Sequence, residues 1–219
     1  MFARLIWVID ETPHPAALNM AIDEALLFNG GDCPLFRAYR WRQHPVSIGY
    51  FSSWEQAITV YPGREIVRRW TGGGMVEHGD DFTYSLLLPV NCRPPASRDL
   101  YREVHTRIVE TLAANGRSAA VVPTGSGPSL PGRCFERSVE NDVEIAGVKV
   151  AGAAIRRLRC GVIFQGSVQG ISIDPEFAAR FTQKLAGVVE KTALSTVTTL
   201  LAERIANEKY GTESWTRRY

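Results

Sequence analysis

The chain has 219 residues, a net charge of +2 and 45% hydrophobic residues. These values are ordinary for a globular protein, and a chain of this length buries roughly 70% of its unfolded surface without disulfides or a structural metal. The small net charge argues against nucleic acid as a partner. Local basic clusters suit phosphate groups or acidic proteins, or simply form a solvated face: Arg64, Arg68 and Arg69, and Arg156, Arg157 and Arg159.

Cysteines and the N-terminal segment indicate the compartment. The four cysteines form no C-x-x-C pair, which argues against a zinc or dithiol redox motif: Cys33, Cys92, Cys134 and Cys160. The N-terminal segment has one short apolar run, followed by Asp10 and Glu11, so neither a signal peptide nor a membrane span is expected. We therefore expect one domain over residues 1–219 in the cytoplasm, where a reduced cysteine can serve as a nucleophile.

Apolar periodicity predicts the elements of the first half of the chain. The expected elements are a strand over 5–9, a helix over 16–28, strands over 35–41 and 46–50 joined by a turn at His44-Pro45, a short strand over 66–69 and a strongly apolar strand over 82–90. Gly30-Gly31 is expected to end the helix.

The second half continues with helices and strands around a loop. The expected elements are a helix over 100–115, a flexible Pro-, Gly- and Ser-rich loop over 123–133, strands over 140–145, 148–155 and 161–168, and helices over 175–185 and 195–209. Consecutive strands flanked by helices predict an α+β or mixed α/β domain with a largely antiparallel sheet.

The least ordinary segment is the glycine run Gly72-Gly73-Gly74, which follows Arg68-Arg69. Consecutive glycines cost backbone entropy, so they suit positions where the backbone takes unusual angles or approaches a ligand closely. The run also fits a plain turn between two strands. It matches neither a phosphate-binding P-loop nor a dinucleotide-binding turn. His78 follows shortly after, either as a packed histidine or as a participant in chemistry.

A second informative stretch centres on Lys149. Small and apolar neighbours surround it on a predicted strand, so it is expected either to lose its proton more readily than an exposed lysine or to have an anionic partner. It also fits a lysine that protects an edge strand. Cys134 follows Arg133 on the predicted loop, where a nearby cation favours the thiolate, although a free cysteine is often just a small buried residue.

These stretches together resemble the catalytic domain of the lipoate–biotin protein ligase superfamily. The family's glycine motif corresponds to residues 68–78, and its lysine motif corresponds to residues 147–154. Further similarity covers nearly the whole chain, at residues 19–26, 47–51, 165–167 and 209–215. The resemblance implies a class II synthetase-like fold and a pocket for an octanoyl or lipoyl group. The substrate-binding residues that it implies are Arg69, Thr71, Gly72, Gly73, Gly74, His78, Asn141, Asp142, Gly152 and Ala153.

Within this superfamily the chain is most similar to the single-chain octanoyltransferases, which have a Cys-Phe pair fifteen residues before their lysine. Cys134 and Lys149 have that separation here. The resemblance implies that Cys134 takes the acyl group from an acyl carrier protein thioester, with no ATP or metal, and passes it to a lysine of a lipoyl-domain protein. Lys149 then stabilises the oxyanion or helps to deprotonate the incoming amine. The expected acceptors are the glycine-cleavage H protein or the E2 component of a 2-oxoacid dehydrogenase.

Some positions resemble the ATP-dependent lipoate–protein ligases instead. Asn141-Asp142 and the third glycine, Gly74, match the ligases, and Ala153-Ala154-Ile155 departs from the usual Ser-Ala-Gln. A ligase would require ATP and Mg²⁺. Only seventy residues follow Lys149, which is short for the accessory domain of most single-chain ligases, although a separate subunit could supply one. A non-catalytic acyl-binding protein is the alternative from another functional class.

Overall fold

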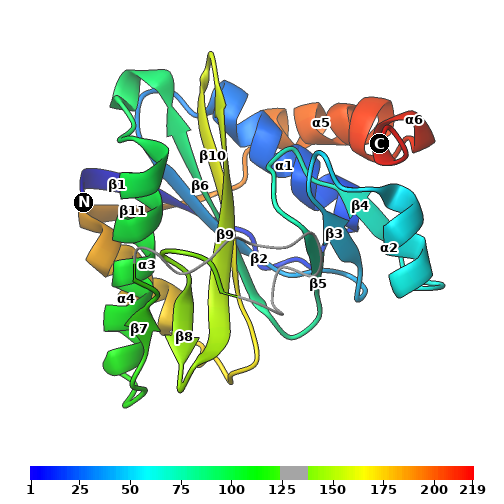
Figure 1. The fold of residues 1–219 in the computed structure, drawn as a ribbon. Coiled ribbons are helices and arrows are strands. Elements are labelled where there is room, and N and C mark those ends of the chain that lie inside the picture. The colour runs from blue at the N-terminus through cyan, green and yellow to red at the C-terminus, as the bar shows by residue number, and fades with distance from the viewer. Residues whose placement is uncertain (124–137) are drawn as a thin grey trace.

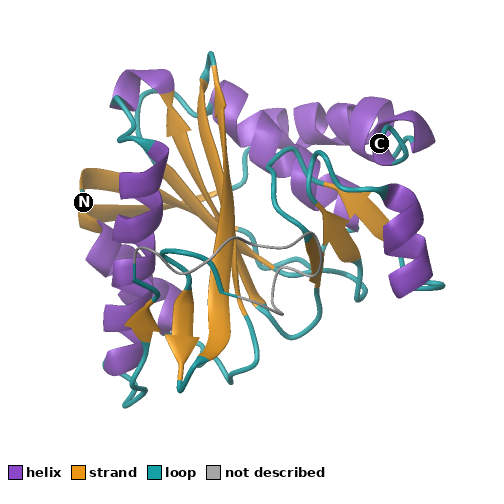
Figure 2. Ribbon diagram, in the orientation of Figure 1, coloured by secondary structure: helices purple, strands orange, loops and turns teal. Residues whose placement is uncertain are grey.

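The computed structural model describes residues 1–123 and 138–219, so Cys134 and nearly all of the loop predicted over 123–133 lie outside the described residues. Two sheets and their helices make up the described part (Figures 1 and 2). The larger sheet has eight strands in the order β11-β1-β2-β6-β10-β9-β8-β7, and the smaller has three in the order β4-β3-β5. The predicted mixed α/β fold is confirmed.

The elements follow the chain in this order. The strands are β1 (Phe2–Ile9), β2 (Leu35–Tyr39), β3 (Val46–Ile48), β4 (Ile66–Arg68), β5 (Met75–Glu77), β6 (Phe82–Pro89), β7 (Ala120–Val121), β8 (Val143–Ile145), β9 (Val148–Leu158), β10 (Gly161–Val168) and β11 (Ala186–Ala193). The α-helices are α1 (Ala16–Asn29), α2 (Trp54–Val60), α3 (Ser97–Ala113), α4 (Phe177–Leu185), α5 (Thr196–Ile205) and α6 (Glu213–Thr216). A π-helical turn at Ala206–Tyr210 extends α5. No described helix is long and apolar enough to cross a bilayer.

Helices cover both faces of the larger sheet, with α3 and α4 on one side and α1 and α5 on the other (Figure 1). Strand β6 contributes to both layers, because Leu86 and Leu88 pack toward α3 and α4 while Leu87 packs toward α1. Strand β10 repeats this alternation with Phe164 and Ile163. Burial on both faces explains why these central strands appear in the sequence as continuous apolar runs.

The strands predicted over 35–41 and 46–50 both form, but they lie in different sheets. β2 pairs with β1 and β6, whereas β3 pairs with β4 and β5. The connection between them therefore crosses from one sheet to the other instead of forming a hairpin. The smaller sheet packs over its own apolar cluster, in which Val46 and Ile48 contact Ala57 of α2.

The smaller sheet positions the glycine run, which connects β4 to β5. Gly73 has φ = 88°, a left-handed backbone conformation that favours glycine. Gly49 faces the run so closely that a Cβ atom built there would lie 1.8 Å from the Gly73 carbonyl oxygen. A side chain at Gly49 would displace the loop, and one at Gly73 would strain its backbone, so these two glycines satisfy a local backbone requirement.

Arg68, the last residue of β4, holds this region to the C-terminal segment. Its guanidinium is buried and donates to the backbone carbonyls of Gly49 and Ser52 at 3.0 and 2.7 Å. It also donates to the carbonyl of Thr216 at 2.8 Å, and Trp215 Nε1 donates back to the Arg68 carbonyl at 2.9 Å. Arg68 therefore has a structural role, and its cation is not directed at a ligand.

Candidate functional site

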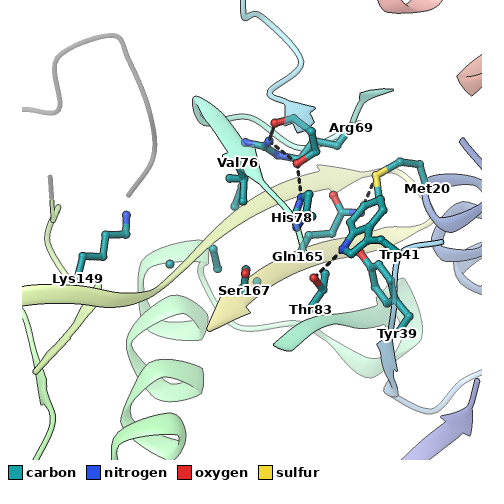
Figure 3. A pocket seen from close by; sticks show the side chains of 15 residues that line it. Met20, Tyr39, Trp41, Arg69, Val76, His78, Thr83, Lys149, Gln165 and Ser167 are labelled. Carbon is teal, nitrogen blue, oxygen red and sulfur yellow. Dashed lines mark hydrogen bonds between the residues drawn. The ribbon is translucent and has the colours of Figure 1, made fainter. Parts of the chain in front are cut away.

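A pocket lies where α1, the smaller sheet and the central strands β6, β9 and β10 meet. Figure 3 shows Lys149 on one side of it, across from the cluster that contains Trp41, His78 and Gln165. The lining combines apolar groups with a few buried polar groups, as in sites that bind small ligands: Met20, Tyr39, Trp41, Ser47, Arg69, Val76, His78, Thr83, Lys149, Gly152, Ala153, Ala154, Gln165, Gly166 and Ser167.

Lys149 has the anionic partner that its apolar neighbours predicted. Its Nζ lies 2.7 Å from Asp142 Oδ2, and the side chains of Lys149 and Asp142 are 7% and 0% exposed. The Lys149 side chain lies along its own strand toward Gly152, because a Cβ built on Gly152 would lie 2.7 Å from Lys149 Cε and 2.9 Å from Nζ. Gly152 thus leaves room for the lysine to reach the pocket, and the structure brings these three predicted residues together.

Tyr101 of α3 also contacts the Lys149–Asp142 pair, although no sequence motif pointed to it. Its hydroxyl donates to Asp142 Oδ1 at 2.6 Å and accepts from the backbone N–H of Ala153 at 2.9 Å. Burial, reinforced by the Asp142 carboxylate, raises the pKa of Tyr101 well above its usual value, so the hydroxyl remains a donor. Tyr101 therefore contacts one oxygen of Asp142 and Lys149 the other, and the fixed carboxylate holds the Lys149 ammonium in position.

Asn141 contributes through its backbone. It has φ = 69°, and its N–H donates to the Val122 carbonyl at 2.9 Å. Its own carbonyl accepts a 2.5 Å hydrogen bond from His105 Nδ1. Burial lowers the pKa of His105 to about 4, so the ring is neutral at pH 7. The resemblance implies that Asn141 binds substrate, and these contacts show that its backbone also positions Asp142.

The glycine run is held from within by Arg69. One guanidinium nitrogen, Nη2, donates to the carbonyls of Gly72 and Gly74 at 2.7 and 2.9 Å. The other, Nη1, donates to the carbonyl and hydroxyl oxygens of Ser47 at 3.0 and 3.2 Å. Arg69 thereby sets the shape of the loop and forms part of the pocket wall.

His78 lies on the same wall, between a hydroxyl and a carboxylate. Its Nε2 is 2.8 Å from Ser47 Oγ, its Nδ1 is 2.9 Å from Asp81 Oδ2, and its ring stacks on Trp41. Because an ionised carboxylate only accepts hydrogen bonds, Nδ1 donates to Asp81. The chain of contacts continues through Ser47 to Arg69, so His78 is connected to the glycine loop.

Asp81 anchors this chain. Its Oδ2 accepts hydrogen bonds from Thr83 and Ser167, both at 2.6 Å, in addition to the one from His78. Burial by itself raises the pKa of Asp81, but these hydrogen bonds and the electrostatic attraction of His78 outweigh it and hold the pKa well below its usual range. Asp81 was not identified from the sequence, although it follows His78 by only three residues.

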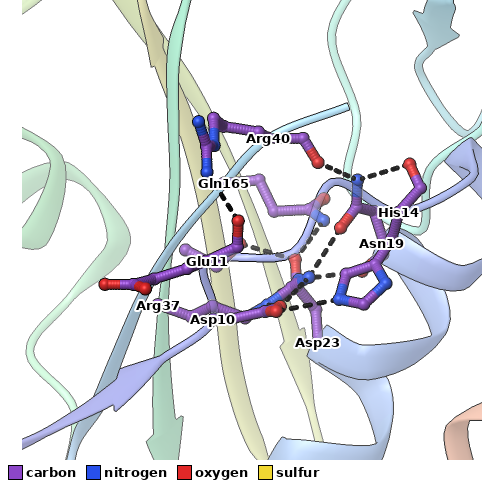
Figure 4. A network of polar contacts seen from close by, with 9 residues as sticks. Asp10, Glu11, His14, Asn19, Asp23, Arg37, Arg40 and Gln165 are labelled. Carbon is purple, nitrogen blue, oxygen red and sulfur yellow. Dashed lines mark hydrogen bonds and ion pairs between the residues drawn. The ribbon is translucent and has the colours of Figure 1, made fainter. Parts of the chain in front are cut away.

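A second chain of hydrogen bonds connects the glycine run to a buried carboxylate, that of Asp23, through Thr71. Thr71 Oγ1 donates to Gln165 Oε1 at 2.8 Å, and Gln165 Nε2 donates to Asp23 Oδ2 at 2.8 Å. Figure 4 shows the network beyond this point, in which the buried guanidinium of Arg37 pairs with Asp23 and Asp10 at 2.9 and 2.7 Å. The network compensates the charge of a fully buried arginine and fixes α1 against β10.

The predicted site residues therefore fall into three groups. Lys149, Arg69, His78, Gly152 and Ala153 line the pocket directly. Gly72, Gly73, Asn141 and again Ala153 line an adjoining groove. Thr71, Gly74 and Asp142 hold these residues through hydrogen bonds or an ion pair. Cys134 lies outside the described residues, and within the described ranges no three His, Cys, Asp or Glu side chains form a metal-binding group.

Two solved structures with the same fold are described as lipoate protein ligases. The chain superposes on a putative lipoate protein ligase from T. acidophilum with bound lipoic acid, with a TM-score of 0.79, 20% identity and 100% coverage of both chains. A lipoate-protein ligase A bound with ATP gives a TM-score of 0.78 at 22% identity, with 99% of both chains covered. At these identities the likeness establishes the fold.

Sequence relatives narrow the family further. The octanoyltransferase LipM of Oceanobacillus iheyensis is 34% identical over 172 residues, which cover 73% of this chain and 62% of that one. The LipM of Symbiobacterium thermophilum is 32% identical over 199 residues, 83% of this chain and 71% of that one. The matched region thus spans 62% and 71% of the length of these two relatives. A model described as the lipoyl protein ligase A/B catalytic domain matches residues 15–207, and the chain belongs to that family.

Proposed function

We propose that the chain transfers an octanoyl group, or a lipoyl group, from an acyl carrier protein thioester to a specific lysine of a lipoyl-domain protein. The observation that carries the proposal is the buried Lys149–Asp142 pair beside a largely apolar pocket. Relatives named as LipM octanoyltransferases support the same reaction. The apolar part of the pocket suits an eight-carbon chain, and the ammonium suits the carbonyl at its end.

The proposed reaction has two steps that need no ATP. The Cys134 thiolate attacks the thioester carbonyl, and the carrier protein's thiol leaves as the Cys134 thioester forms. The amine of the target lysine then attacks this thioester, loses a proton and forms an amide, which returns Cys134 to its thiol. The role of Cys134 rests on its spacing from Lys149 in the sequence.

In this scheme the Lys149 ammonium stabilises the oxyanion that develops in both steps. Its pairing with Asp142 keeps it in place before substrate arrives, so little reorganisation is required during the reaction. Arg69 and the glycines 72–74 shape the wall beside the acyl chain, and His78 has a binding role there. The proposed acceptors are the glycine-cleavage H protein or a 2-oxoacid dehydrogenase E2.

An ATP-dependent lipoate–protein ligase is the second candidate. Asn141-Asp142 and Gly74 favour it, and a neighbour with the same fold was solved with ATP. Another neighbour is described as a bi-partite lipoate protein ligase from Thermoplasma acidophilum, at a TM-score of 0.75 and 21% identity. A ligase of that kind would require ATP, Mg²⁺ and a second subunit.

One pair of assays separates the candidates. The protein is incubated with an octanoyl carrier-protein thioester, and intact-protein mass spectrometry is expected to show one added octanoyl group that is lost in Cys134→Ala. In parallel, octanoate or lipoate, Mg-ATP and a lipoyl domain are supplied, and pyrophosphate is followed. Strong pyrophosphate release that persists in Cys134→Ala would overturn the transferase. Reversible binding with neither adduct nor transfer would indicate a non-catalytic acyl-binding protein.

A further inference from the structure

A second groove adjoins the acyl pocket. It lies between the glycine loop and α3, and it shares Ala153 and Ala154 of β9 with the pocket, so the two cavities meet at that strand. Its walls are mostly backbone and small or neutral side chains, and its lining is Gly72, Gly73, Ser97, Arg98, Tyr101, Val139, Glu140, Asn141, Ala153, Ala154 and Ile155. A ligand that extends outward from the reaction point has this groove as a path.

Arg157 lies at the outer end of this groove. Side chains alternate along a strand, so Arg157 shares with Ala153 and Ile155 the face of β9 that is directed toward α3. Its Nε donates to the hydroxyl of Ser97, which lines the groove, at 3.0 Å. Within residues 1–123 and 138–219 no carboxylate forms an ion pair with Arg157, and the side chain is exposed. Within the described part of the chain, the groove therefore ends beside a positive charge that no carboxylate compensates.

The other arginine on the groove has a different environment. Arg98 donates through Nε and Nη2 to Glu140 Oε1, at 2.9 and 2.6 Å. Because Glu140 also lines the groove, the charge of Arg98 is balanced locally. Among residues 1–123 and 138–219, the groove and its outer end thus carry a single positive charge that no neighbouring carboxylate balances, that of Arg157.

The distance along β9 from the Lys149 ammonium to Arg157 sets the length of a ligand that would reach from one to the other. The Lys149 ammonium lies over Gly152, because a Cβ there would be 2.9 Å from Nζ. The five residues from Gly152 to Arg157 rise about 3.3 Å each along the strand, a span of about 17 Å. A phosphopantetheine arm is a linear, uncharged chain with two amide units, a thiol at one end and one phosphate at the other, and it extends over a similar length.

We infer that this groove receives the phosphopantetheine arm of the acyl donor and that the Arg157 guanidinium binds its phosphate. The inference rests on the proposed function, because it assumes a carrier thioester as donor. The thioester lies at the Lys149 end, the acyl chain enters the pocket, and the two amides follow the neutral walls. One arginine then matches the single negative charge of a phosphodiester.

The test uses donors that differ only in the phosphate. Rates of octanoyl transfer to a lipoyl domain are measured with octanoyl-phosphopantetheine and with octanoyl-pantetheine, for the wild type and Arg157→Gln. We expect kcat/KM of the variant to fall about tenfold with the phosphorylated donor and to remain unchanged with pantetheine, since a charge-assisted hydrogen bond is lost only in the first case. Arg159→Gln is the matched control, because it removes the same charge two residues further along, and it is expected to behave as the wild type.

Each other result has a defined meaning. An equal fall with both donors, or an equal fall in Arg159→Gln, overturns the assignment of the phosphate to Arg157 while transfer itself remains established. Absence of transfer from every thioester donor overturns the proposed function, and the inference falls with it.

A second variant tests the path of the arm. Ser97→Trp narrows the outer end of the groove, and the variant's folding is checked by its thermal unfolding. We expect KM to rise for the carrier-protein thioester and for octanoyl-phosphopantetheine, but not for octanoyl-N-acetylcysteamine, which ends before that point. A rise for all three donors, or for none, would show that the arm does not follow this groove.

Discussion

Two buried carboxylates on different walls of the pocket are satisfied in different ways. Asp142 pairs with the Lys149 ammonium and accepts a hydrogen bond from Tyr101. Asp81 lies with His78, Thr83 and Ser167 and holds the wall that leads to the glycine loop. The first carboxylate orients a cation beside the place proposed for the acyl carbonyl. The second fixes the position of a wall through hydrogen bonds.

The difference indicates which contacts affect chemistry and which affect shape. A cation that a carboxylate holds in a buried site is already oriented toward developing negative charge. Hydroxyl and imidazole donors that converge on one carboxylate stiffen their surroundings but add no charge to the substrate site. Substitution of Lys149 should therefore reduce the rate of acyl transfer more than the free energy of unfolding. Substitution of Asp81 should reduce the free energy of unfolding more than the rate.

The largest effect is expected for Lys149→Met, which removes the oxyanion-stabilising cation. We expect octanoyl transfer to fall by about 10³-fold, measured by mass spectrometry of the acceptor domain. The variant also leaves Asp142 buried without its cation, at a cost of about 3 kcal/mol in the free energy of unfolding. Adding Asp142→Asn is expected to restore much of the stability and none of the activity. Lys191→Met, on the distant strand β11, is the control. Transfer within tenfold of the wild type in Lys149→Met would refute the assignment.

Asp81→Asn tests the opposite wall. Loss of the charged acceptor is expected to lower the free energy of unfolding by about 3 kcal/mol at pH 7, as measured by urea denaturation. The pKa of Asp81 is depressed in the folded protein, so its stabilisation is present above the unfolded pKa of about 4 and decreases as pH falls below it. The variant should therefore lose less stability than the wild type between about pH 4 and pH 2. Equal acid sensitivity of the two proteins would contradict this role.

His105→Asn tests the pH dependence of stability near Lys149, where His105 bonds the backbone carbonyl of Asn141. The pKa of His105 is about 4 in the folded protein against 6.5 for the free side chain. Between these values the unfolded chain binds the proton more strongly, so wild-type stability falls as pH drops from about 6.5 to about 4, by at most about 3 kcal/mol. An asparagine amide can replace the Nδ1 donor without titrating. Unfolding curves at pH 7 and pH 4.5 should therefore differ less for the variant, and an unchanged difference would rule His105 out as the source.

The smallest effect is expected for Ser47→Ala, which interrupts the chain between His78 and Arg69. One hydroxyl is removed, so the free energy of unfolding should fall by about 1 kcal/mol. Because the glycine loop loses one of its constraints, KM for the acyl donor should rise several-fold with kcat nearly unchanged. Ser214→Ala, which removes an exposed hydroxyl bonded to Thr212 in the C-terminal segment, is the control and is expected to leave KM unchanged. A fall in kcat without a rise in KM would indicate that Ser47 has a direct chemical role.

The sequence predicted most of the strands, because the central strands carry apolar runs and end at glycine or proline. It did not predict β11, which pairs in parallel with β1 and is mostly exposed, so its side chains show little apolar alternation. It also gave no sign of α2 or β5, which are short and are stabilised by the small cluster around Ala57. Elements held mainly by long-range contacts have weak local signals.

In the candidate site, too, residues with a local sequence signal were predicted and residues held by long-range contacts were not. The motifs located Lys149 and the glycine run, since both carry unusual local composition. Tyr101 and His105 lie on α3, where their spacing fits an ordinary core-facing helix, and their function-related contacts are with residues about forty positions away. Their partners became apparent only when β8, β9 and α3 were placed together.

The parallel pairing of β1 with β11 has a consequence for how the protein is made. Phe2 pairs with Ala186 and Ile9 with Ala193, so one side of the first strand stays unpaired until more than 180 residues have been synthesised. A nascent chain with this connectivity exposes an apolar strand edge for much of its synthesis, and contacts of such long range close slowly. We expect the yield of folded protein to depend on chaperones that shield this segment during translation.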